Sequence, residues 1–175
     1  GVESYNTVAT VQASESWAPL TASFTMPDCA QITKAQLYFE RQFGQSSPVA
    51  DLYLDAVSVR AQAPSANLLP NGDFEASSAG WYTWNGAVST TTDRAHGGAS
   101  SLVVTGSSAI GPAATDILSL IEAGTSYSYS AWLSLGGEVP GNVAATFNLI
   151  CDGVESYNWV GSTQVSGDWA NLTGT

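Results

Sequence analysis

The chain has 175 residues, of which 44% are hydrophobic and only 11% are charged, with 4 Lys and Arg against 15 Asp and Glu. The formal net charge of −11 disfavours binding to nucleic acid or to an anionic membrane surface, because both need clustered basic side chains. No apolar run approaches the roughly 20 residues of a membrane span. No signal peptide leads the chain, so we interpret Gly1 as a mature or trimmed end. The low charge and 17 Gly are typical of secreted all-β proteins, and we expect secretion.

Segments rich in β-branched and aromatic residues, many with period-two alternation, recur along the chain and predict β-strands. In chain order they are residues 2–12, 17–26, 34–43, 50–59, 100–106, 125–135 and 142–150. Turns with Gly or Pro separate them, and residues 116–122 predict one short helical turn. Many short strands with close turns predict an all-β fold, a β-sandwich of two antiparallel sheets.

The first 23 residues recur at the end of the chain. Residues 1–23 align without a gap on residues 153–175, at an offset of 152 residues, and 13 of the 23 positions are identical. One domain has room for a single copy, so we expect the other to pair at a sheet edge, to remain free or to complete a neighbouring molecule. Within the second copy, residues 154–163 and 168–175 predict a hairpin.

The offset predicts how the chain is organised. We expect one β-sandwich over residues 1–175, built from the C-terminal part of one repeat (1–60) and the N-terminal part of the next (67–175). A small-residue linker would occupy residues 61–66. A tandem array cut out of phase and a circular permutation both explain this order.

The two cysteines, Cys29 and Cys151, are too few for a disulfide scaffold and lack zinc-site spacing. Shifted by one repeat, Cys29 would face Cys151 across the base of the predicted hairpin. We therefore expect a Cys29–Cys151 bridge in an oxidising compartment, with two buried free thiols as the alternative.

A series of loose motifs gives the chain a resemblance to a known family. They include Asn71-Gly72-Asp73-Phe74-Glu75, Gly80-Trp81, Leu37-Tyr38-Phe39-Glu40 and Leu54-Asp55. In wrapped order the chain resembles the carbohydrate-binding modules of families 4, 9, 16 and 22, most closely the xylan-binding family 22. The resemblance implies a jelly-roll β-sandwich that binds polysaccharide on a concave face, through aromatic rings and hydrogen-bonding side chains.

The family's Tyr-x-Glu pair matches Tyr38 and Glu40, which implies that Tyr38 stacks on sugar and Glu40 accepts hydroxyl groups. By period two, Gln36 shares their face. The alternative is an ordinary exposed strand face. An isoleucine, Ile110, stands where family 22 has a stacking tryptophan, which puts xylan in doubt.

Further aromatic residues extend this expectation. Tyr157, or its duplicate Tyr5, matches another cleft tyrosine, and Trp159 shares its face while the first copy has Thr7. Tyr82 and Trp84 alternate with Trp81 and form another candidate platform, with rim or core packing as the alternative. Four tryptophans match core positions: Trp17, Trp81, Trp132 and Trp169.

The resemblance also implies a structural Ca²⁺ held by Asp55 and Glu75, because carboxylate oxygens suit this hard cation; a solvated acidic pair is the alternative. Motifs of nucleophilic, nucleotide-binding or zinc-dependent enzymes are absent, and we expect no catalytic activity.

Two functions therefore compete. The first is a non-catalytic module of a secreted multi-modular glycoside hydrolase that binds xylan, β-glucan or mannan. The second is a structural repeat of an extracellular fibre, adhesin or surface layer, whose subunits self-associate through the duplicated segment.

Overall fold

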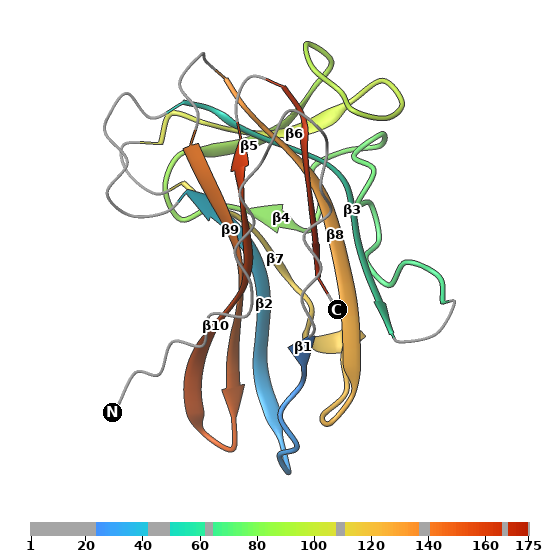
Figure 1. Ribbon diagram of the computed structural model, residues 1–175, viewed down its shortest axis with the longest axis vertical. Helices are drawn as coiled ribbons and strands as arrows, with labels where there is room; N and C mark the ends of the chain where they lie inside the picture. The colour runs from blue at the N-terminus through green and yellow to red at the C-terminus, as the bar shows by residue number, and fades with distance from the viewer. Residues whose placement is uncertain are drawn as a thin grey trace.

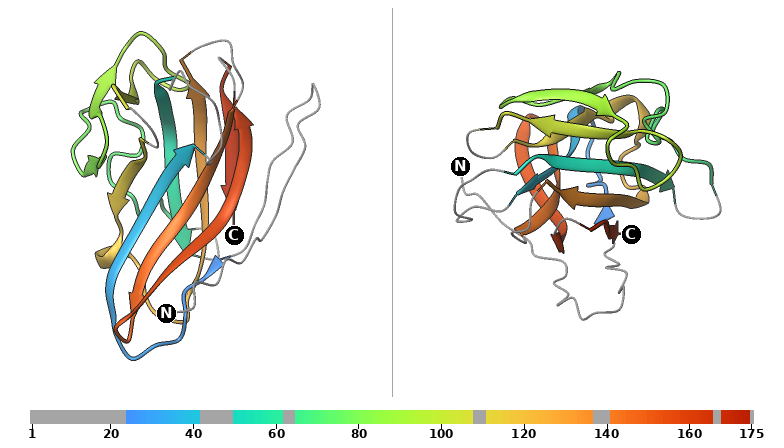
Figure 2. Two further views of the ribbon diagram at one scale, coloured as in Figure 1. Left: turned by 90° about the vertical axis from the view of Figure 1, so that its left-hand side faces the viewer. Right: turned by 90° about the horizontal axis from the view of Figure 1, so that it is seen from above.

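The computed structural model describes residues 24–41, 50–61, 65–107, 111–136, 141–165 and 168–174. These residues form eleven strands in two antiparallel sheets, as the sequence predicts, and one 3₁₀ turn, η1 (Leu118–Leu120), inside the expected helical turn. The two sheets form two layers that face each other (Figures 1 and 2).

The first sheet has six strands, in the order β1-β8-β3-β6-β5, and β11 also pairs with β8. Its strands are β1 (Phe24–Thr25), β3 (Leu52–Ala61), β5 (Ala87–Thr91), β6 (Ser101–Thr105), β8 (Ser126–Leu135) and β11 (Ala170–Gly174).

The second sheet has five strands, in the order β10-β9-β2-β7-β4. Its strands are β2 (Ile32–Arg41), β4 (Trp81–Tyr82), β7 (Ala113–Asp116), β9 (Gly141–Cys151) and β10 (Val154–Val165). β2 pairs with β9 and β7, and β3 pairs with β8 and β6, so the early strands lie between later ones in both sheets.

Apolar side chains fill the space between the sheets. The ring of Phe147 on β9 stacks on Phe24 of β1 at 4.5 Å between centroids, and meets Tyr129 of β8 edge-on at 6.0 Å. Trp81 is 7% exposed and contacts Phe39 and Phe74, which confirms the core position predicted for it. Burial of this apolar surface is the main stabilising contribution to the fold.

The predicted hairpin of residues 154–175 is wrong. β10 pairs with β9 in the five-stranded sheet, whereas β11 pairs with β8 in the six-stranded sheet. The chain therefore crosses from one sheet to the other between these two strands, and each strand lies on an outer edge. We call β10 and β11 together the seated copy of the duplicated segment.

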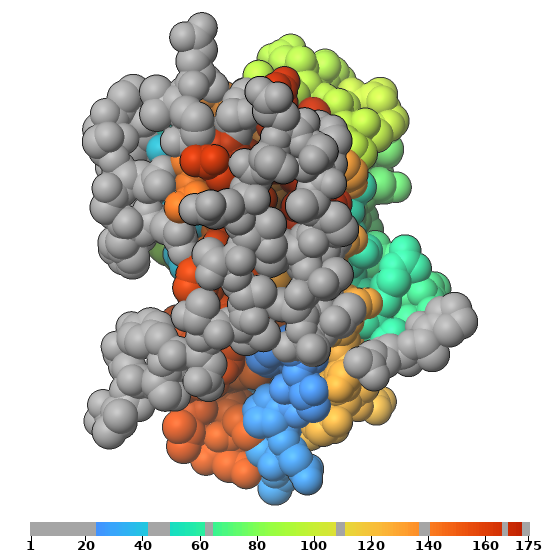
Figure 3. All heavy atoms as spheres, viewed as in Figure 1, coloured from blue at the N-terminus to red at the C-terminus, as the bar shows by residue number. Residues whose placement is uncertain are grey.

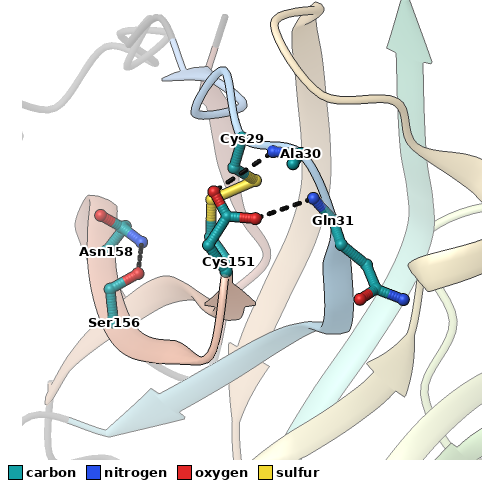
Figure 4. The surroundings of a disulfide bond; sticks show 7 residues. Cys29, Ala30, Gln31, Cys151, Ser156 and Asn158 are labelled. Carbon is teal, nitrogen blue, oxygen red and sulfur yellow. Dashed lines mark hydrogen bonds between the residues drawn. A yellow bond between two sulfur atoms is a disulfide. The ribbon is translucent and has the colours of Figure 1, made fainter.

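The disulfide joins Cys29 and Cys151, with 6.0 Å between their Cα atoms (Figure 4). The expected pairing is present, but its reason differs from the predicted hairpin: Ile32, three residues after Cys29, pairs with Cys151 across β2 and β9. The Asp152 carboxylate accepts N–H bonds from Ala30 and Gln31, which hold the same corner. In Figure 3 the blue residues of this corner lie beside the orange turn that follows β9.

Five predicted strands match β2, β3, β6, β8 and β9, while the short strands β4, β5 and β7 were not expected. Residues 1–23 lie outside the described residues, and with them Tyr5 and Trp17; so does Ile110. Of the predicted linker, Ala61 still belongs to β3, and residues 62–64 lie outside the described residues.

Candidate functional site

The candidate site is the outer face of the five-stranded sheet, opposite the core. On β2, Leu37 and Phe39 are fully buried in the core, so the alternating side chains point to the other side of the sheet. Directly paired residues of neighbouring strands point to the same side. The register therefore brings six predicted residues to one face: Gln36, Tyr38, Glu40, Tyr82, Tyr157 and Trp159.

Tyr38 lies in the middle of one row across this face. The row runs from Tyr82 through Ala114 to Tyr38, and then through Thr146 to Trp159. Only short side chains separate its aromatic residues.

The Tyr38 ring is 6% exposed and meets the Trp84 ring edge-on, with 5.3 Å between centroids, whereas Trp84 is 57% exposed. Tyr38 thus supports Trp84 more than it presents its own ring to solvent. Trp84 offers the larger accessible aromatic surface at this end of the face.

A hydrogen-bonded group fixes Tyr82. Its hydroxyl and the Gln36 Nε2 both donate to Asp116 Oδ1, each at 3.1 Å, and Gln36 Nε2 also donates to the Tyr82 Oη. Burial, followed by the bond to Asp116 and its charge, raises the pKa of Tyr82 to about 12. Asp116, on the unexpected strand β7, was missed in the sequence because its role depends on cross-strand partners.

A second group surrounds Glu155. Its Oε1 accepts from Lys34 Nζ at 3.0 Å, Asn148 Nδ2 at 3.1 Å and Tyr157 Oη at 3.3 Å. The bond from Lys34 is the first cause that lowers the pKa of Glu155. These contacts orient Tyr157, which is 44% exposed. Sequence reasoning missed Glu155 and Asn148, although Glu155 lies in the duplicated segment.

Two buried polar atoms on this face have no partner among the described residues: Asn148 Oδ1 and Trp159 Nε1. Because Glu155 needs a donor, it fixes Nδ2 of Asn148 toward itself and turns Oδ1 away. An unsatisfied buried polar group costs about 1–3 kcal/mol. One acceptor and one donor buried on this side of the sheet therefore have no hydrogen bond from the described residues.

Glu40 is the remaining carboxylate of the face and lies opposite Ala144. Burial raises the pKa of Glu40 from 4.5 to about 7. Near neutral pH this group therefore exchanges between an acid that donates a hydrogen bond and a carboxylate that only accepts.

The two residues expected to bind calcium lie on the six-stranded side and hold one loop. Asp55 Oδ2 accepts N–H bonds from His96 and Gly97, at 2.7 and 2.8 Å, and its Oδ1 accepts from Ala56. Glu75 accepts from Ala99 through both oxygens and from Ser100. We call this arrangement the loop clamp.

The loop clamp does not fit the predicted calcium site well. All four carboxylate oxygens already accept N–H bonds, whose hydrogens occupy lone pairs that a cation would use. Gly98 adopts φ +64°, and a Cβ there would collide with the Glu75 carboxylate, so this close approach requires glycine. Calcium at Asp55 and Glu75 stays a prediction.

The loop clamp places His96 on the outer face of the six-stranded sheet. The His96 ring stacks on Trp132 at 3.7 Å and meets Trp169 edge-on at 6.0 Å. Both tryptophans are half-buried, so the core positions predicted for them are wrong. Alternation on β8 points Trp132 outward, and the distant loop covers it.

The CBM_4_9 family model, described as a carbohydrate binding domain, matches residues 66–175. The match includes strands β4 to β11. Searches of curated proteins and of solved structures gave no significant match. Among the described residues, no helix has the length and apolar character needed to span a membrane.

Glu40 gives a pH dependence that can be measured. A carboxyl whose pKa is raised in the folded state stabilises it fully below the ordinary pKa of 4.5, and this contribution is lost as the pH rises through about 7. We expect the free energy of unfolding of the wild type to fall, relative to Glu40→Gln, between about pH 5 and pH 8. Urea unfolding at several pH values measures the difference. A difference that does not change with pH would contradict the buried state of Glu40.

The loop clamp predicts that Asp55→Asn destabilises the fold by about 2 kcal/mol, because charge-assisted bonds to backbone N–H groups are weakened. Glu122→Gln, at an exposed position, is the matched control. Thermal unfolding in EDTA and in CaCl2 measures both variants. We expect the same loss in both buffers; a loss confined to CaCl2 would show that an ion, and not the N–H groups, is held there.

Proposed function

Because the chain belongs to this family of carbohydrate-binding domains, we propose that it binds a neutral polysaccharide on the outer face of the five-stranded sheet. The observation that carries the proposal is the position of the exposed aromatic rings. Among the described residues, the exposed large hydrophobic side chains are Trp84, Leu118, Val154 and Tyr157. The two aromatic ones both belong to this face.

Aromatic rings suit sugars because the apolar face of a sugar ring packs on a π-surface. Trp84 would provide one such surface, supported from below by Tyr38. Tyr157 would provide the other, held by its bond to Glu155. Tyr38 and Tyr157 lie on β2 and β10, which are separated by β9. At ordinary strand spacing the axes of these two strands are about 10 Å apart. A polysaccharide chain, and not a single sugar, is therefore the ligand that can contact both the Trp84 surface and the Tyr157 surface.

Hydroxyl recognition would come from the polar side chains between the rings. Asn148 Oδ1 and Trp159 Nε1 are buried, so a hydroxyl would reach them only by displacing the side chains that cover them, and it would then remove the cost of leaving them unpaired. Glu40 would accept a hydroxyl when ionised. Gln36 and Tyr82 would extend the polar surface, with their orientation set by Asp116.

The net charge supports a neutral ligand of the xylan, β-glucan or mannan class, because an acidic polysaccharide would be repelled. We propose that the domain binds without catalysing a reaction: Asp116 and Glu155 are engaged in orienting their neighbours. The disulfide supports a secreted protein, and a glycoside hydrolase is the partner domain we propose.

The alternative function, a structural repeat of an extracellular fibre, adhesin or surface layer, is favoured by a separate observation. The seated copy occupies one edge of each sheet, and 13 of the 23 residues in its block recur at the start of the chain. Edge strands are the natural place for exchange between subunits.

Affinity electrophoresis on xylan, β-glucan and mannan tests the proposed binding. We expect retardation on at least one polysaccharide, and about a tenfold loss of affinity in Trp84→Ala and in Tyr157→Ala, since each removes a stacking surface. Long oligosaccharides should bind more tightly than a disaccharide. His96→Ala, an exposed ring on the other sheet, is the matched control and should bind like the wild type.

Absence of retardation on all three polysaccharides would contradict carbohydrate binding. Retardation that is lost in His96→Ala and kept in Trp84→Ala and Tyr157→Ala would instead place the site on the six-stranded sheet.

A further inference from the structure

Strands β11 and β1 lie along the same edge of β8. β11 pairs from Ala170 opposite Leu133 to Gly174 opposite Tyr129, and β1 pairs Phe24 with Tyr127. In Figure 1 the dark red strand β11 runs down beside β8 toward β1. Two segments from opposite ends of the chain thus share one edge.

The register of the two strands is continuous once the repeat is counted. Shifted by the offset of 152 residues, Phe24 becomes position 176 and pairs with residue 127. Position 176 follows the β11 pair of residue 174 with residue 129 without a gap in register. β11 and β1 therefore correspond to two parts of one strand of the repeat. Shifted by the same offset, residues 18–22, which come shortly before β1 in the sequence, correspond to residues 170–174 of β11.

The residues that hold the seated copy in place recur in the sequence of the first copy. Leu172 is fully buried, the Val160 carbonyl accepts from Tyr129 Oη at 2.9 Å, and Glu155 pairs with Lys34. Tyr157 Oη donates to Glu155 Oε1. Trp169, which directly precedes β11, meets the His96 ring edge-on. The identical counterparts of these five residues are Glu3, Tyr5, Val8, Trp17 and Leu20.

The differences between the copies favour the seated one. Val165 is 1% exposed and its counterpart is Ala13, which would leave two methyl groups fewer in the core. Asn171 of β11 corresponds to Pro19, which has no backbone N–H to donate. The first copy therefore keeps the shared residues but fits this edge less well than the seated copy does.

We propose that the edges of β9 and β8 that β10 and β11 occupy are a docking surface for either of two segments of the same chain. Residues 2–22 can take the place of Val154–Gly174. In the exchanged form, residues 18–22 lead directly into β1, whereas the chain is discontinuous after β9, at Asp152 and Gly153. The exchange also replaces Trp159 by Thr7 on the outer face of the five-stranded sheet, so it removes one indole from that face.

The same chain is the favoured source of the second segment. Residue 23 directly precedes Phe24, which already pairs with β8 in the required register. No linker has to be spanned, so the effective concentration of residues 2–22 at this edge exceeds that of a second molecule.

Unfolding of the full chain tests the exchange through the duplicated leucines. Leu20→Ala alone should leave the melting temperature unchanged. Leu172→Ala should lower it by no more than half as much as the double variant, because residues 2–22 then dock with Leu20 in the core. Leu133→Ala is the matched control, since it is fully buried on β8, outside the duplicated segment. It should show the same shift whether or not Leu20 is present. Equal shifts in Leu172→Ala and in the double variant would overturn the proposal.

A cysteine pair identifies the occupant directly. Thr173 pairs with Ser130, so residue 21 would take that position after exchange. In the Leu172→Ala background, Thr21→Cys with Ser130→Cys should form a crosslink within one chain, detected by peptide mapping of the monomer. No crosslink, or a crosslink found only in covalent dimers, would contradict exchange within the chain; the second result would identify a second copy as the occupant. Neither readout uses a sugar, so the outcome is independent of carbohydrate binding.

Discussion

The position of β2 determines most of the candidate site. It lies between β9 and β7 in the middle of the five-stranded sheet, and Leu37 and Phe39 are fully buried on its inner side. A shift of one residue would turn these side chains to solvent and bring polar groups into the core, so the register is strongly fixed. Because β2 is fixed, Gln36, Tyr38 and Glu40 face outward, and β7 and β9 align their own side chains beside them.

The two outer faces of the sandwich then differ in what covers them. On the six-stranded sheet, the loop clamp of Asp55 and Glu75 places His96 over Trp132. On the five-stranded sheet, side chains are tied to one another through Asp116 and Glu155, and two aromatic rings are exposed above them. Because neighbouring side chains already orient these groups, they lose less conformational entropy when a ligand binds. This preorganisation, together with the family match, is why we propose the outer face of the five-stranded sheet as the carbohydrate-binding face.

The sequence was sufficient wherever local periodicity decides the outcome. Period two predicted the shared face of Tyr38 and Glu40, and the family pattern predicted the core position of Trp81. It was insufficient where distant segments decide. β10 and β11 resemble a hairpin around Ser166 and Gly167, yet they belong to different sheets. The family pattern also placed Trp132 in the core, but β8 points it outward, and His96, 36 positions earlier in the chain, stacks on it. Asn148 and Asp116 acquire their roles only from partners on other strands.

Residue-specific NMR during a titration with a neutral oligosaccharide tests the central claim most directly, because it locates the bound ligand without altering the protein. Binding on the proposed face predicts amide shifts that cluster on residues 36–40, 82–84, 144–148 and 155–159. The amides of His96 and Trp132, on the other face, should stay unchanged. Shifts that cluster around His96 and Trp132, or no shifts with any neutral oligosaccharide, would contradict the assignment of this face as the carbohydrate-binding site.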